Sequence, residues 1–338
     1  MIRYPQLEAG ASIAITAPSS GVRQELHGLI HQAQARLEAK GYQVVVGKTV
    51  WTQHNAKSAP ADVRAAELNA MLRDEWISLI FPPWGGELLI ELVDLIDYGA
   101  IRPKWILGYS DTSVLLLAVT LMTGLATAHG ANLIDNRGEF ADETTGMWEN
   151  VLATRAGESV RQQSSPKYQL AWDPDNPSPC VFHLTEPTYW RTVGGGSAKM
   201  SGRLLGGCID VIRHLIGTAY GDVARFRQTH LNGEPIIWYL ENCELSTADM
   251  RRSLVQMKLA GWFDHCAGLL FGRSGAERST DGYTAEDMYR ELAEELGVPV
   301  VYDVDCGHVP PQLTFVNGAR ADIEVNEGKA VMTQIFVE

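Results

Sequence analysis

Short apolar runs alternate with segments of helical periodicity along the first half of the chain. The run at 12–17 is followed by apolar residues at helical spacing from Leu26 to Leu37, and Gly41 then ends the pattern. Short apolar runs bounded by Pro, Gly or Ser are typical of buried strands, and a spacing of three or four residues is typical of an amphipathic helix. The expected strands are 12–17, 42–46, 76–81 and 105–107, and the expected helices are 26–37, 61–72, 88–96 and 114–122.

Strands that alternate with helices in this way are typical of a parallel sheet covered by helices on both faces. We therefore expect an α/β fold whose N-terminal domain has a doubly wound, mostly parallel sheet. In such folds, functional groups gather at the carboxyl ends of the strands. The pair Gly85-Gly86 follows one expected strand and Ser110 follows another, so we expect them to share one crevice.

The pattern changes after about residue 154. The segments 162–166 and 173–179 are rich in turn-forming residues and lack periodicity, which indicates a crossing between domains. We divide the chain into an N-terminal α/β domain (1–154), an interdomain crossing (155–180) and a C-terminal, strand-rich α+β domain (181–338). In the last of these, the expected strands are 236–240, 268–271, 300–304, 321–325 and 331–336, and the expected helices are 247–260 and 285–296.

Composition and charge narrow the class of protein. A net charge of −13 argues against nucleic acid or an anionic membrane as the main partner, because both attract basic surfaces. The 5 cysteines are far apart and form no C-x-x-C pair, so neither a zinc knuckle nor a disulfide framework is expected. The N-terminus lacks the apolar core of a signal peptide, and no apolar run is long enough to span a bilayer. We therefore expect a cytoplasmic protein with reduced thiols.

The stretch 105–113 carries the strongest chemical signal. An apolar strand ends in Gly-Tyr-Ser-Asp at 108–111, and a helical segment begins directly after it. A serine on a sharp strand-to-helix turn projects from the backbone, and the helix N–H groups behind it can stabilise a negative charge. The pattern predicts a nucleophile elbow at Ser110 and hence a serine hydrolase, although Thr112 replaces the second glycine of G-x-S-x-G. A Ser-Asp helix cap is the structural alternative.

A serine nucleophile needs a base, and the base needs an acid that orients it. Among the 9 histidines, His129 and His308 each adjoin a glycine at the end of an apolar segment. His308 is the better candidate, because a rigid proline turn follows it. Glu241 is the first charge after the expected strand 236–240, where an unpaired carboxylate is costly. Glu244 is the competing acid.

The backbone N–H groups of Gly85, Gly86 and Asp111 are the candidate oxyanion hole. Glycine lets a backbone N–H approach a substrate closely. One such donor stabilises a transition state by about 3–4 kcal/mol. A plain tight turn is the structural alternative for the two glycines. No phosphate loop or complete dinucleotide fingerprint is present, since the glycines at 194–196 lack the required strand and helix.

Several short sequence blocks, taken in their order along the chain, resemble those of the LD-carboxypeptidases, the serine peptidase family that includes the microcin C immunity proteins. The matching blocks are 15–20, 85–86, 103–111, 202–208, 239–242 and 307–308. The resemblance implies a triad with Ser110 as nucleophile, Glu241 as orienting acid and His308 as general base. It also implies a site at the junction of two domains, a tendency to form homodimers, and neither a metal nor an organic cofactor.

The family has two branches with different substrates. One branch releases the terminal D-alanine of murein tetrapeptides in cell-wall recycling, and the other cleaves an amide in aminoacyl nucleotides such as processed microcin C. Trp190 is a candidate stacking platform for a nucleobase, worth about 1–3 kcal/mol, and Arg191 and Arg273 are candidates for a carboxylate or phosphate. Packing at the domain interface and surface ion pairs are the structural alternatives. We favour the aminoacyl nucleotide, with the murein peptide as the alternative and a non-catalytic binding protein as an alternative of another class.

Overall fold

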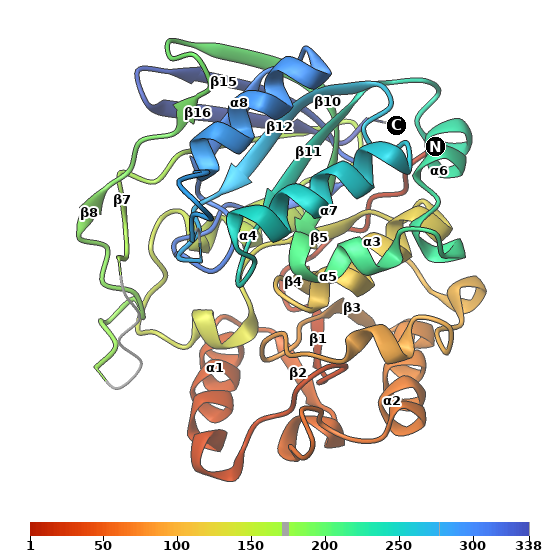
Figure 1. Ribbon diagram of the computed structural model, residues 1–338. Helices are drawn as coiled ribbons and strands as arrows, with labels where there is room; N and C mark the ends of the chain where they lie inside the picture. Colours follow the sequence, from red (N-terminus) through yellow and green to blue (C-terminus); the bar gives the residue numbers. More distant parts are fainter. Residues whose placement is uncertain (171–175, 277, 338) are drawn as a thin grey trace.

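The computed structural model describes residues 1–170, 176–276 and 278–337, whose strands form two large sheets and one short pair (Figure 1). The first sheet has the strand order β14-β5-β4-β3-β1-β2, and all its strands except β14 pair in parallel. The expected mostly parallel sheet is therefore confirmed. Its strands are β1 (Ser12–Ile15), β2 (Gln43–Val46), β3 (Ile77–Ile80), β4 (Trp105–Gly108), β5 (Thr127–His129) and β14 (Phe315–Asn317).

The helices of the N-terminal part surround this sheet. Figure 1 shows α1 and α2 on opposite sides of β1, β2 and β3. Helix α3 packs against β4, β5 and the long strand β10 of the second sheet, so it lies between the two sheets. Its side chains are buried from Thr112 to Leu121, as expected of a helix that is apolar all round. The helices are α1 (His27–Ala39), α2 (Ala61–Arg73), α3 (Thr112–Thr123) and α4 (Trp148–Ala153).

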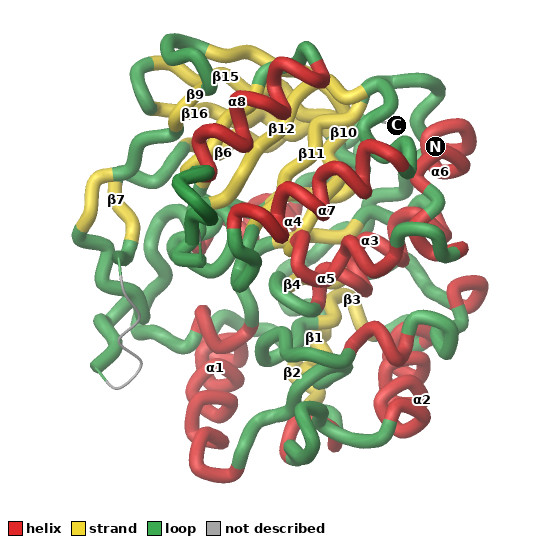
Figure 2. Tube along the Cα trace, viewed as in Figure 1, coloured by secondary structure: helices red, strands yellow, loops and turns green. Residues whose placement is uncertain are grey.

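The second sheet, drawn as the yellow strands in the upper half of Figure 2, is mixed. Its central strands pair in parallel. Its strand order is β6-β16-β15-β10-β11-β12-β13-β9, with parallel pairing from β10 to β13 and antiparallel pairing elsewhere. The strands are β6 (Ser159–Gln163), β9 (Arg191–Thr192), β10 (Ala198–Cys208), β11 (Ile236–Glu241), β12 (Cys266–Gly272), β13 (Val300–Val304), β15 (Arg320–Asn326) and β16 (Lys329–Ile335). The short pair is β7 (Lys167–Tyr168) with β8 (Glu186–Pro187), and the helices are α5 (Ile209–Ile212), α6 (Val223–His230), α7 (Thr247–Leu259) and α8 (Ala285–Leu296).

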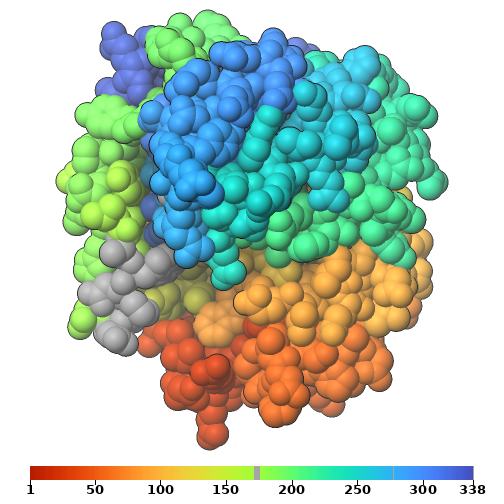
Figure 3. Space-filling model, viewed as in Figure 1, coloured from red at the N-terminus to blue at the C-terminus, as the bar shows by residue number. Residues whose placement is uncertain are grey.

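Both faces of the second sheet are covered. Along β11, Ile236, Trp238 and Leu240 pack in one hydrophobic cluster, while Ile237 and Tyr239 pack in the other. This alternation follows from the two-residue period of a strand, and it explains why the whole segment is apolar. Figure 3 shows the region of α1 and α2 (red to orange) at one end of the molecule and the α8 region (blue) at the other. Within the described residues, no helix combines the length and the apolar character that a bilayer crossing requires.

Three features differ from the expected elements. Strand β6 lies inside the expected crossing 155–180, yet it pairs with β16 at the edge of the second sheet. Strand β14 returns from the C-terminal half and completes the first sheet beside β5. The expected helix 88–96 is reduced to a 3-10 helix at Leu89–Leu92 followed by turns. Of the turn-rich segment 173–179, residues 173–175 lie outside the described residues, and the domain division itself stays a prediction.

Candidate active site

Ser110 occupies the turn between β4 and α3. Its φ angle is 62°, a left-handed conformation that residues other than glycine seldom adopt. Such a conformation costs on the order of 1–3 kcal/mol and persists only where the surrounding structure imposes it. Here β4 on one side and the buried α3 on the other fix the turn. As a result, Ser110 is half-buried while its neighbours Tyr109 and Asp111 are buried.

His308 connects Ser110 to Glu241 through the two nitrogens of its ring. Its Nε2 lies 3.1 Å from Ser110 Oγ, and its Nδ1 lies 2.8 Å from Glu241 Oε2. Glu241 is the last residue of β11, and His308 follows β13 in the same sheet. Ser110 follows β4 of the other sheet, so the three side chains meet where the carboxyl ends of both sets of parallel strands converge. The competing acid, Glu244, is exposed, and its N–H donates to Asp210 Oδ1 at 2.8 Å.

Burial makes the acid and the imidazole depend on each other. Burial alone would raise the pKa of Glu241, but the charge of His308 and its hydrogen bond keep that pKa below the usual value. Burial likewise opposes protonation of His308, yet Glu241 raises the pKa of the imidazole above its usual value. The pair therefore favours the form in which Nδ1–H donates to a charged carboxylate. Ligand atoms of Cys208, Glu241 and His308 all lie within 4.8 Å of one another, so these three could also hold a metal ion.

Of the two glycines after β3, Gly85 lies directly against the serine turn, whereas Gly86 lies against Ser19 and Ser20. A Cβ atom on Gly85 would be 2.6 Å from Ser110 Cβ and 2.8 Å from the Asp111 nitrogen. Gly86 has a φ angle of 144°, which L side chains rarely adopt. The N–H groups of Gly86 and Asp111 donate to no acceptor among the residues that the structure describes. Two backbone donors are thus available beside the Ser110 hydroxyl. The expected α-helix after Gly86 is absent, so these donors do not come from a second helix N-terminus.

The Asp111 side chain has a role that the sequence pattern did not indicate. Its buried carboxylate accepts the Ser19 hydroxyl and the Leu89 N–H, the latter at 2.8 Å. Arg64 ties the same loops together, because its Nη1 donates to Pro18 O at 2.8 Å and to Leu88 O at 3.0 Å. These bonds fasten the loops after β1 and β3 to the serine turn. No spacing along the chain signals them, because each joins residues that are far apart in sequence.

A cavity of about 540 Å³ opens beside Ser110 and His308. Gly85 and Gly86 line it, together with side chains from the first domain. Trp84 contributes an aromatic ring held by a hydrogen bond from Nε1 to Gly21 O at 3.2 Å. Arg23 contributes a cation, and it is exposed at the rim. The cavity is therefore large enough for a small ligand and offers both aromatic and polar contacts.

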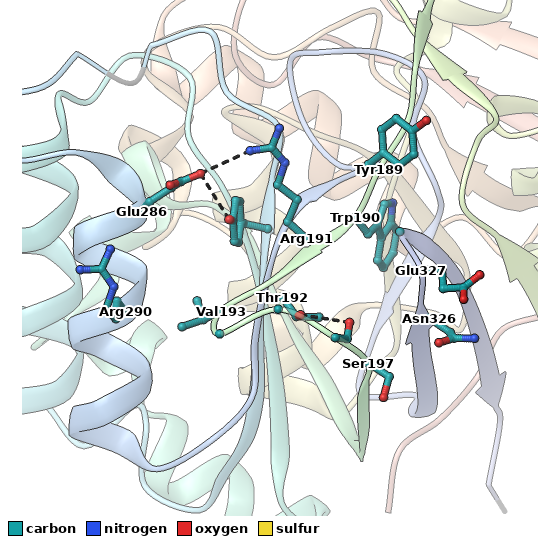
Figure 4. Close-up of a pocket in the computed structure, with 15 residues that line it drawn as sticks. Tyr189, Trp190, Arg191, Thr192, Val193, Ser197, Glu286, Arg290, Asn326 and Glu327 are labelled. Atoms are coloured by element: carbon teal, nitrogen blue, oxygen red, sulfur yellow. Dashed lines mark hydrogen bonds and ion pairs between the residues drawn. The ribbon is translucent and has the colours of Figure 1, made fainter.

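Trp190, Arg191 and Arg273, the residues expected to bind substrate, do not line this cavity, so their expected role stays a prediction that this geometry does not support. Trp190 and Arg191 line a different cavity of about 590 Å³ (Figure 4). Only 2% of Trp190 is exposed, so its ring has no free face on which a nucleobase could stack. Arg191 is paired with Glu286 at 3.3 Å and with Asp303 at 3.2 Å, which leaves it a surface ion pair.

Trp190 and Arg273 both interact with the carboxylate of Asp305. This fully buried carboxylate accepts Trp190 Nε1–H at 2.9 Å and the Ser165 N–H at 2.8 Å, and it forms an ion pair with Arg273. Asp305 lies three residues before His308 along the chain. Asp305, Trp190 and Arg273 thus form a buried polar cluster that anchors the segment carrying His308. The alternative histidine, His129, is buried in β5, with Nδ1 3.9 Å from Cys306 Sγ.

The sequence matches two family domains with known names. Residues 13–130 match the LD-carboxypeptidase N-terminal domain, and residues 201–323 match the LD-carboxypeptidase C-terminal domain. A putative carboxypeptidase of Vibrio cholerae is 28% identical, with 96% of this chain and 95% of the relative aligned. The microcin C7 self-immunity protein MccF of Escherichia coli is 25% identical, over 89% of this chain and 87% of that protein. A probable murein peptide carboxypeptidase of Bacillus subtilis is also 25% identical, over 96% and 92%.

Solved structures show the same fold. The wild-type microcin C7 self-immunity protein MccF superposes with a TM-score of 0.82 at 22% identity, covering 100% of both chains. A muramoyltetrapeptide carboxypeptidase from Oxalobacter formigenes superposes with a TM-score of 0.73 at 20% identity, covering 96% of this chain and 99% of the other. Other MccF structures hold adenosine monophosphate, glutamyl sulfamoyl guanosine or aspartyl sulfamoyl adenosine. Together with the two domain matches, these likenesses show that the chain belongs to the LD-carboxypeptidase family of serine peptidases.

Proposed function

We propose that this protein hydrolyses an amide bond in a small peptide or aminoacyl compound, with Ser110, His308 and Glu241 as its catalytic triad. The observation that carries the proposal is the continuous set of contacts from Ser110 Oγ through both nitrogens of His308 to Glu241. A buried acid, an oriented imidazole and a serine hydroxyl beside a cavity are the components of nucleophilic amide hydrolysis.

The proposed reaction has two steps, formation of an acyl-enzyme and its hydrolysis, and His308 transfers a proton in both. His308 Nε2 takes the proton of Ser110 as its Oγ attacks the carbonyl carbon, while Glu241 stabilises the charged imidazole through Nδ1–H. The N–H groups of Gly86 and Asp111 donate to the oxygen that becomes negative. His308 then gives its proton to the leaving amine, and an acyl-enzyme remains. A water molecule, activated by the same imidazole, releases the acid and restores the serine.

For the substrate, we infer an aminoacyl nucleotide or a similar aminoacyl amide. The MccF structures hold ligands of this class. With Trp190 buried, the inference now depends on Trp84, whose half-buried indole lines the cavity beside Ser110 and could stack on a nucleobase. Release of D-alanine from a murein tetrapeptide is the second candidate. Arg23 favours it, because this rim cation has no ion pair among the described residues and could bind a terminal carboxylate.

The test offers both substrates in parallel to the purified protein, with Ser110→Ala as the control and mass spectrometry of the products. We expect serine-dependent cleavage of an aminoacyl sulfamoyl adenosine. Release of D-alanine alone would assign the protein to the murein branch instead. Cleavage of neither, combined with failure of a fluorophosphonate to label Ser110, would favour the non-catalytic binding protein. Homodimer formation and a cytoplasmic location stay predictions.

A further inference from the structure

The acid of the proposed triad lies next to a thiol. Glu241 is fully buried, and its Oε2 accepts the His308 hydrogen bond. Its Oε1 is buried and meets no donor at ordinary hydrogen-bond geometry among the described residues, and the Cys208 thiol is close enough to lower the pKa of this carboxyl through a weak hydrogen bond. A buried carboxylate oxygen without a partner is costly, and native proteins rarely retain one. A cation bound between this carboxylate and the thiol would therefore satisfy the oxygen better than the weak thiol hydrogen bond does.

Cys208 would supply a thiolate, a ligand that favours Zn²⁺ and similar cations over Mg²⁺ or Ca²⁺. It ends β10, directly opposite Glu241 in the parallel pairing of β10 and β11. Its thiol is fully buried and lies beside the Asp210 carboxylate, with Sγ 3.4 Å from Oδ2. A thiolate, an imidazole and a carboxylate are a set of ligands that Zn²⁺ and similar thiophilic cations prefer. Since all three ligand atoms lie within 4.8 Å of one another, side-chain movements of about 1 Å would bring them around one ion.

We propose that Cys208, Glu241 and His308 form an inhibitory site for a thiophilic divalent cation such as Zn²⁺. Binding would release the Cys208 proton to solvent and place the cation at His308 Nδ1, the nitrogen next to Glu241. The neutral ring would then carry its proton on Nε2, facing Ser110. An imidazole in that tautomer accepts no proton from the serine, so the bound enzyme is inactive. The site itself stands on the geometry alone, whereas the inhibition rests on the proposed function.

The experiment uses Cd²⁺ as a spectroscopic probe and Zn²⁺ as the inhibitor. We expect one equivalent of Cd²⁺ to give an ultraviolet thiolate-to-metal absorption band in the wild-type protein, and Zn²⁺ to abolish hydrolysis reversibly with EDTA. In Cys208→Ser the band should disappear, and the Zn²⁺ concentration for half-inhibition, relative to that variant's own rate, should rise at least about tenfold. Cys266→Ser is the matched control. This half-buried thiol begins β12 opposite Ile236, the residue at the end of β11 that is remote from Glu241.

His308→Asn gives a second test if Cys208→Ser folds poorly, since this side chain is partly exposed and its removal should weaken Cd²⁺ binding about tenfold. A wild-type protein without the band, or equal Zn²⁺ inhibition of the wild type and Cys208→Ser, would overturn the site. Loss of the band in Cys243→Ser but not in Cys208→Ser would do so too, because Cys243 also lies beside His308. If the protein cleaves no substrate, the Cd²⁺ band still decides whether the site exists.

Discussion

Replacing Gly85 by alanine tests whether the loop after β3 fixes the serine turn. The added Cβ would lie 2.6 Å from Ser110 Cβ, whereas ordinary contact begins at 3.4 Å, so the two segments must separate by about 0.8 Å. The nearest atoms belong to the serine and to the Asp111 backbone, which α3 holds in place. A misplacement of about 1 Å at a reacting centre can cost about 100-fold in rate, equivalent to about 2.7 kcal/mol.

We therefore expect Gly85→Ala to lower kcat/KM by about 100-fold and to slow fluorophosphonate labelling of Ser110 by a similar factor. Gly85 does not have a left-handed φ angle, so the effect is steric and not a consequence of backbone strain. Gly28→Ala is the matched control, because a Cβ at this exposed position in α1 meets nothing within 4 Å. If folded Gly85→Ala reacts within about threefold of the wild type, the proposed contact between the loop and the nucleophile is refuted.

Three further predictions concern the acid, the buried tryptophan and pH. Glu241→Gln should lower kcat by a factor on the order of 10³–10⁴ with little change in KM, whereas Glu244→Gln should match the wild type; equal losses would contradict the geometry. Trp190→Phe leaves Asp305 without one donor and should destabilise the fold by about 1–3 kcal/mol in urea unfolding without changing KM; a selective rise in KM for an aminoacyl nucleotide would restore a stacking role. Burial lowers the pKa of His129 from 6.5 to about 4, so the unfolded chain binds the proton first and stability should fall by about 3 kcal/mol as pH drops from about 6.5 to 4. His129→Asn should flatten that dependence, and an equal slope in both proteins would contradict it.

The positions of Ser110 and Glu241 at the ends of strands could be predicted from the sequence. Ser110 follows β4 and Glu241 ends β11, and both boundaries are visible as the end of an apolar run. Element boundaries alone did not decide whether Glu241 or Glu244 contacts His308. A linear pattern does not tell which of two nearby acids still belongs to the strand, and therefore which one points toward the imidazole.

The burial of Trp190 could not be predicted, for a different reason. The residue lies in a segment that reads as an irregular loop, yet its indole N–H donates to a carboxylate 115 positions away. A contact of that separation leaves no trace in local periodicity. The expected helix 88–96 failed for a related reason. Its apolar spacing is helical, but the Leu89 N–H donates to Asp111 Oδ2, which holds the segment against the serine turn in a shorter 3-10 helix.

The return of β14 makes the first sheet depend on the C-terminal half of the chain. During translation, the nucleophile turn emerges long before the acid, the imidazole and β14, which pairs with β5 from Phe315 to Asn317. Until that strand arrives, β5 presents an open edge, a surface prone to pairing with other chains. A product truncated between residues 308 and 315 would thus keep Ser110, Glu241 and His308 but lack the last strand of the first sheet. Premature termination should therefore leave a protein that proteases and chaperones recognise by the open edge of β5.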